Sequence, residues 1–116
     1  MPRIEIDRLK QILLTLEDSY PDWRGVDLGI EDDRLRSYYV DFLHKDGLVE
    51  AKNWGFDQTG DDWKATGLTP DGHRMAEALR AAPADWRERA MRLVKAEGRS
   101  LTWEMAKKYL WQLMGQ

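Results

Sequence analysis

The sequence predicts an α+β fold in which a helix, a short strand and a second helix precede an antiparallel hairpin, and additional helices follow it. Three observations support this prediction. An amphipathic helix ends at Gly47 and runs directly into a strand that begins at Leu48. A second strand returns over residues 63–68 after a loop rich in glycine and aspartate. Thr69-Pro70 then supplies a threonine N-cap and a proline at the first helical position. This order is that of a winged helix-turn-helix.

The N-terminal residues predict one helix and one short strand. Apolar residues recur on one face of a helix from about Glu5 to Asp18. Pro21 disfavours helical geometry at the residue before it, so the helix ends there. Beyond it, apolar residues alternate with aspartate and glycine, which indicates a short strand; they are Val26, Leu28 and Ile30.

The central residues predict a helix followed by a hairpin. Asp32 or Asp33 is a suitable N-cap for a helix that reaches Lys45, and Gly47 is placed to end it in a left-handed conformation. A strand over residues 48–54 and the returning strand are joined by residues 55–62. Trp54 and Trp63 flank this loop and are expected to pair across the hairpin.

Three further helices are expected, with a domain boundary after residue 82. The helix that begins at Thr69-Pro70 has a buried side formed by Met75, Ala78 and Leu79. The next is defined by Trp86, Ala90, Leu93 and Val94 and stops at Gly98. Ser100 caps the last, whose apolar face carries Trp103, Ala106, Leu110 and Leu113. Residues 1–82 are therefore interpreted as a winged-helix domain. Residues 83–116 are interpreted as a helical pair that packs on it or on a dimer partner.

Composition and charge limit the classes of function that the chain can have. The chain has 116 residues, no cysteine and a net charge of -3. Disulfides and thiolate zinc sites are thereby excluded, and a reducing compartment is expected. Met1–Glu5 lack a signal-peptide core and no apolar run approaches a membrane span, so a cytoplasmic protein is predicted. Residues 1–74 carry a net charge of -6, and residues 75–116 carry a net charge of +3.

The residues that usually carry catalysis occur in no recognisable pattern, so a non-enzymatic protein without a cofactor is predicted. His44 and His73 have no metal-binding spacing. His73 is expected to be a packed residue in the first turn of its helix. Asp57, Asp61 and Asp62 lack the spacing of a calcium loop.

Nucleic-acid binding is the function that a winged helix suggests, through the helix Asp33–Lys45 and the hairpin residues Asn53–Lys64. The candidate contacts to double-stranded DNA are Arg34, Arg36, Ser37, His44, Lys45, Asn53 and Lys64. Two features oppose this interpretation. Acidic residues surround the candidates, and only eleven residues separate Pro21 from Asp33, which leaves at most one turn for a bracing helix.

The chain also resembles a family of short winged-helix proteins of unknown function found in bacteria, phages and mobile elements. The matching segments are Ile6–Leu14, Tyr39–Glu50, Leu68–His73 and Trp86–Thr102. The resemblance implies the fold and a role in binding nucleic acid or another partner, with no catalytic residues to carry over.

Two functions are therefore expected. The first is a DNA-binding or transcription-regulator-like protein. The alternative is a protein-interaction or dimerisation module that keeps the fold without binding DNA. A homodimer through the C-terminal helices is a candidate assembly, beside packing of these helices on the winged-helix domain. Trp54 and Trp63 are the tryptophans best placed to stack on a base.

Overall fold

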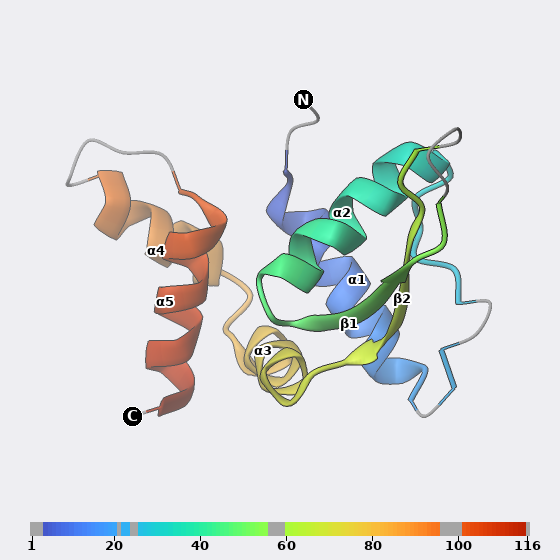
Figure 1. Ribbon diagram of the computed structural model, residues 1–116. Coiled ribbons are helices and arrows are strands. Elements are labelled where there is room, and N and C mark those ends of the chain that lie inside the picture. The colour runs from blue at the N-terminus through green and yellow to red at the C-terminus, as the bar shows by residue number, and fades with distance from the viewer. Residues whose placement is uncertain (1–3, 21, 24–25, 56–59, 96–100, 116) are drawn as a thin grey trace. The chain divides into compact units, whose positions relative to one another are not determined.

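The protein is described by a computed structural model that covers residues 4–20, 22–23, 26–55, 60–95 and 101–115 (Figure 1). Within this part of the chain there are five helices and one two-stranded antiparallel sheet. The elements are α1 (Ile6–Asp18), α2 (Asp33–Lys45), β1 (Val49–Asn53), β2 (Trp63–Leu68), α3 (Pro70–Ala81), α4 (Trp86–Lys95) and α5 (Trp103–Gly115). The predicted α+β class is confirmed. None of the described helices is both long and apolar enough to cross a membrane.

The chain forms two compact units, residues 1–76 and 77–116. The division falls inside α3, whereas the domain boundary predicted from the sequence follows residue 82. The first unit contains α1, α2, the sheet and the start of α3. The second contains the rest of α3 together with α4 and α5.

The core of the first unit lies between the helices and the hairpin. α2 packs against both strands, and α1 packs against β2 (Figure 1). The apolar face predicted for α1 is almost fully buried at Leu9, Leu13 and Leu16. The hydroxyl of the buried Tyr39 accepts a hydrogen bond of 2.8 Å from the backbone N–H of Glu5, which ties α2 to the start of α1.

The ends of α2 form as the sequence predicts. The Asp32 side chain accepts hydrogen bonds from the N–H groups of Arg34 and Leu35, at 2.9 and 3.1 Å, and so caps the helix. At the other end Gly47 has a φ of +80°, and its N–H donates to the carbonyl of His44 at 3.1 Å. This geometry turns the chain from helix to strand within two residues.

The two strands pair with an irregularity in β2. Glu50 lies opposite Gly67 and Ala51 lies opposite Ala65, so Thr66 is an extra residue, as in a β-bulge. Asn53, rather than Trp54, lies opposite Trp63. The predicted cross-strand pair of tryptophans is therefore wrong, because β1 ends one residue before Trp54.

The start of α3 is anchored to the start of β1. Thr69 caps the helix by accepting a hydrogen bond of 2.9 Å from the N–H of Gly72, as predicted. The same hydroxyl donates to the carbonyl of Gly47 at 2.7 Å. Gly72 lies so close to the backbone that an added Cβ would be 1.9 Å from the carbonyl oxygen of Leu48. Only glycine permits this approach.

Residues 26–30 do not form the predicted strand. Gly29 has a φ of +79°, and its N–H donates to the Asp27 carboxylate at 2.8 Å. This turn interrupts the extended backbone that a strand needs. Leu28 and Ile30 are nevertheless buried, so the alternation reports burial of these side chains rather than strand pairing.

In the second unit α4 packs against α5 (Figure 1). Most of the apolar residues predicted for these two helices are buried, but Leu93 and Leu113 are 62% and 46% exposed in the single chain. The Thr102 hydroxyl accepts a hydrogen bond of 3.3 Å from the N–H of Met105 and caps α5. The predicted cap at Ser100 and the predicted stop at Gly98 lie outside the described residues.

Candidate functional site

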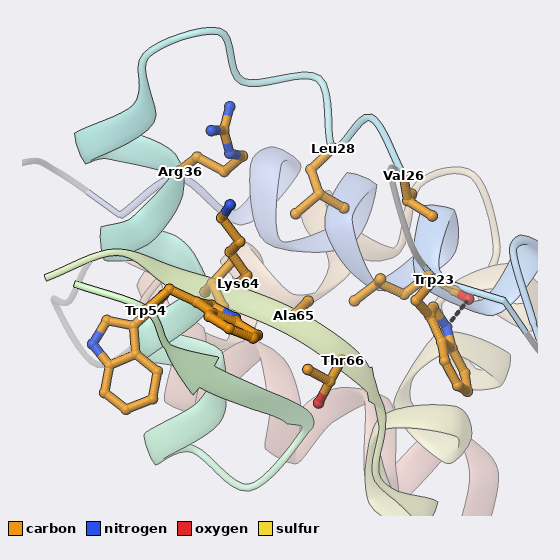
Figure 2. Close-up of a pocket in the computed structure, with 11 residues that line it drawn as sticks. Trp23, Val26, Leu28, Arg36, Trp54, Lys64, Ala65 and Thr66 are labelled. Atoms are coloured by element: carbon orange, nitrogen blue, oxygen red, sulfur yellow. Dashed lines mark hydrogen bonds between the residues drawn. The ribbon is translucent and has the colours of Figure 1, made fainter.

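An open pocket of about 590 Å³ lies within the first unit, between β2 and residues 26–28 (Figure 2). This volume falls within the range of about 300–1,000 Å³ that is typical of ligand sites. Its apolar floor is formed by Leu16 of α1, Leu28, and Val40 of α2, all of which are buried. We call this pocket the β2 groove.

Four consecutive residues of β2 line the groove, Trp63 to Thr66. Successive side chains of a strand point to opposite faces of the sheet. A pocket that contacts all four must therefore run along an edge of the strand rather than over one face. β1 pairs with the other edge of β2, since the sheet has only these two strands in the described residues. The groove follows the free edge.

Trp23 forms one end of the groove. Its indole Nε1 donates a hydrogen bond of 2.8 Å to the carbonyl of Leu16, and its ring meets Tyr20 edge-on at a centroid distance of 5.6 Å. The ring also covers Gly67, where an added Cβ would lie 3.3 Å from it. This end is therefore a fixed aromatic wall.

Trp54 lines the groove as a more exposed aromatic surface. It is 54% exposed, and the ammonium group of Lys52 lies 4.7 Å from the centroid of its ring. A large apolar side chain left this open beside a pocket is available to a binding partner.

Two cations, Arg36 and Lys64, lie near each other at the end of the groove away from Trp23 (Figure 2). The Arg36 guanidinium donates to the carbonyl of Ile30 at 3.0 Å and to the Asp33 carboxylate. It is therefore held in place. The Lys64 ammonium is 3.9 Å from the Asp62 carboxylate, and its side chain is 60% exposed. This loose ion pair leaves Lys64 able to meet a further anionic group.

Three of the residues predicted to contact nucleic acid make contacts that hold the hairpin together. Ser37 is 5% exposed, and its hydroxyl accepts from the N–H of Trp63 at 2.8 Å. His44 Nδ1 lies 3.1 Å from the carbonyl oxygen of Val49, and its ring lies 5.1 Å from that of Trp63. The Asn53 carboxamide oxygen accepts from the N–H groups of Gly55 and Asp62, both at 2.9 Å.

The other predicted contacts are divided between the groove and the surface. Arg36 and Lys64 come together at the β2 groove. Lys45 forms an ion pair of 3.1 Å with Asp41, and Arg34 is exposed near the start of α2. The predicted set of seven is therefore not one continuous surface of available side chains.

Several groove residues are not predicted from the sequence, among them Trp23, Ala65 and Thr66. The alternation over residues 26–30 was the available signal, since it marked side chains that pack beside β2. Trp54 and Trp63 had been singled out beside the hairpin, and both line the groove.

The histidines lie in packing environments. His44 contacts Trp63, as described above, and the ring of His73 meets that of Tyr20 edge-on at 5.8 Å. Within the described part of the chain, no group of three or more histidine and carboxylate residues is arranged to hold a metal ion.

Residues 3–100 match the family described as "Hypothetical protein (DUF2513)", and the chain belongs to that family. No curated protein and no solved structure matches it. Family membership confirms the part of the predicted resemblance that concerns a small family without an assigned activity.

Proposed function

We propose that the protein is a cytoplasmic, non-enzymatic protein-interaction module built on a reduced winged helix. The order of α1, α2, the β1–β2 hairpin and α3 supports the winged-helix assignment, with the hairpin as the wing. The described residues between α1 and α2 form neither a bracing helix nor a strand that extends the sheet. The fold is reduced in this sense.

The observation that carries the proposal is the β2 groove. It combines an apolar floor, a free strand edge and the exposed ring of Trp54. Protein-binding sites typically combine an apolar centre with aromatic anchors. The groove is built from α1, α2, the hairpin and residues between the two helices, so its formation depends on the folding of the first unit.

Insertion of α2 into a DNA groove is the competing function, and the contacts within the fold favour it less. Affinity for duplex DNA depends on neutralising phosphates. On α2, Arg36 and Lys45 are paired with carboxylates, which leaves Arg34 as its more available cation. Ser37 and His44 are engaged with the hairpin.

Affinity capture with matched variants tests the proposal. Ala65 lines the groove and Ala51 lies directly opposite it on β1, where it is equally half-buried but outside the groove. A partner protein retained by the wild type and by Ala51→Leu, and lost with Ala65→Leu, supports the proposal. Equal capture by all three proteins contradicts it.

A salt titration with random duplex DNA tests the competing function. Each phosphate contact should weaken binding by about 0.9 log unit for each log unit of salt. Steep salt-dependent binding that Arg34→Ala weakens would support DNA as the partner, whereas the proposal predicts negligible binding at physiological salt.

A homodimer through the second unit is a further candidate, and it is favoured by the exposure of Leu93 on α4 and Leu113 on α5. Burial of these two side chains against a second copy would remove apolar surface from water. This assembly is independent of the β2 groove, which lies in the first unit.

A further inference from the structure

We infer that β2 accepts an extended peptide as an additional strand, and that the peptide carries one acidic residue opposite Lys64. This inference rests on the proposed function, since it names the kind of partner that the β2 groove binds. It follows from the backbone, the apolar floor and the charges of the groove.

The backbone of β2 provides hydrogen-bonding groups for an added strand. One edge of β2 pairs with β1. In the described residues, none of residues 26–30 makes a backbone hydrogen bond to β2, although Val26 and Leu28 lie across the groove from it. The N–H of Trp63 on this edge already donates to the Ser37 hydroxyl. The register points the backbone groups of Ala65 away from β1, so Ala65 presents its N–H and C=O to the groove. Such an edge is a template for a strand from another chain.

The side chains define the sequence that fits. Exposure alternates along the open part of β2: Trp63 and Ala65 are half-buried, whereas Lys64 and Thr66 are exposed. A strand added beside β2 follows the same alternation. Its apolar side chains meet the floor around Leu16, and the residues between them lie beside the outward side chains of β2.

The charges select one acidic residue. A carboxylate opposite Lys64 forms a cross-strand pair of opposite charge, near the Arg36 guanidinium (Figure 2). Asp62 and Asp33 lie beside these two cations and repel any excess of negative charge. A peptide with a single glutamate or aspartate therefore fits the groove better than a polyacidic one.

The probe is the N-acetylated, fluorescein-labelled hexapeptide Thr-Val-Glu-Val-Thr-Val, titrated into the full-length protein and followed by fluorescence anisotropy. It alternates valine with polar residues and carries one carboxylate. We expect saturable binding. Replacing its glutamate by lysine should weaken binding to the wild type and strengthen binding to Lys64→Glu, each by about two- to fivefold. If the wild type did not prefer the glutamate peptide, and Lys64→Glu did not prefer the lysine peptide, the pairing with Lys64 would be overturned.

A pair of N-methylated peptides tests the strand itself. Alternate amides of a strand point to opposite edges, so methylating the three amides of one set blocks pairing with β2, and methylating the other set does not. The inference predicts that one peptide of the pair binds at least about tenfold more weakly and that the other binds like the parent. If both N-methylated peptides lost binding, or if neither did, the inference that the peptide adds a strand to β2 would be overturned.

Variants of the protein separate this inference from the proposed function. Ala65→Leu narrows the groove and should abolish binding of the hexapeptide, while Ala51→Leu leaves it unchanged. If partner capture responds to Ala65→Leu but the hexapeptide does not bind, the groove remains the interaction site and the strand inference fails. Displacement of the bound hexapeptide by random duplex DNA at physiological salt would overturn both the strand inference and the proposed protein-interaction function.

Discussion

The backbone N–H of Trp63, the first residue of β2, donates a hydrogen bond of 2.8 Å to the hydroxyl of Ser37 in the middle of α2. The same hydroxyl lies 3.4 Å from the carbonyl oxygen of Asp61, to which it donates. One buried serine thus fixes the returning strand against the helix and, with it, the position of the β2 groove. Ser37, which the sequence predicts to contact DNA, therefore has a structural role in the fold.

Ser37→Ala should lower the free energy of unfolding by about 1–3 kcal/mol, because it leaves the buried N–H of Trp63 without a partner. Chemical denaturation measures the change. Ser19→Ala is the control, since the Ser19 hydroxyl donates to the carbonyl of Thr15 at the end of α1, at 2.8 Å, and its loss should cost about 0.5 kcal/mol or less. Equal effects of the two substitutions would contradict the role assigned to Ser37.

Gly72→Ala should destabilise the first unit by about 3 kcal/mol or more, because the new Cβ would overlap the backbone carbonyl of Leu48. Gly47→Ala is the matched change at a glycine with a φ of +80° and open space around it. Its cost should be about 1–2 kcal/mol, from the left-handed conformation alone. Thermal or chemical unfolding that ranks Gly47→Ala as the more damaging variant would disprove the close approach at Gly72.

Thr69→Ala should cost about 1–2 kcal/mol, since it removes the N-cap of α3 and the hydrogen bond to Gly47. Thr69→Ser keeps the hydroxyl and should retain most of that stability. Chemical denaturation of both variants provides the comparison. If serine proved as damaging as alanine, the threonine methyl group rather than the hydroxyl would be the stabilising element.

Leu93→Glu and Leu113→Glu should convert a dimer to a monomer if the second unit associates with a copy of itself. Both side chains are exposed in the single chain, so the substitutions should change its free energy of unfolding by only about 0.5 kcal/mol. Sedimentation velocity at high micromolar concentration measures the assembly. A wild-type protein that sediments as a strict monomer would remove the dimer.

Much of the fold follows from local signals. The cap at Asp32, the left-handed Gly47 and the start at Thr69-Pro70 each depend on a few neighbouring residues, and each forms as the sequence predicts. The segment around Gly29 does not. There, an aspartate–glycine turn with a positive φ interrupts a pattern of alternation that sequence alone assigns to a strand.

The site was less predictable because it depends on tertiary placement. Ser37 and His44 belong to a helix whose polar positions resemble a DNA-contacting face, but the hairpin covers them in the folded unit. The β2 groove brings together residues from Leu16 to Thr66. No spacing within the chain signals that β2 keeps a free edge, since this depends on the missing strand at residues 26–30.

Hydrogen exchange of the β2 amides, followed by NMR with and without the hexapeptide, tests the open edge most directly. In the free protein, the amide of Ala65, which points away from β1, should exchange rapidly, whereas that of Trp63 is protected by its hydrogen bond to Ser37. The Ala65 amide should gain about tenfold protection when the peptide is present at about ten times its Kd. An Ala65 amide that is protected in the free protein, or that still exchanges rapidly when the peptide is bound, would contradict a free edge that accepts a strand.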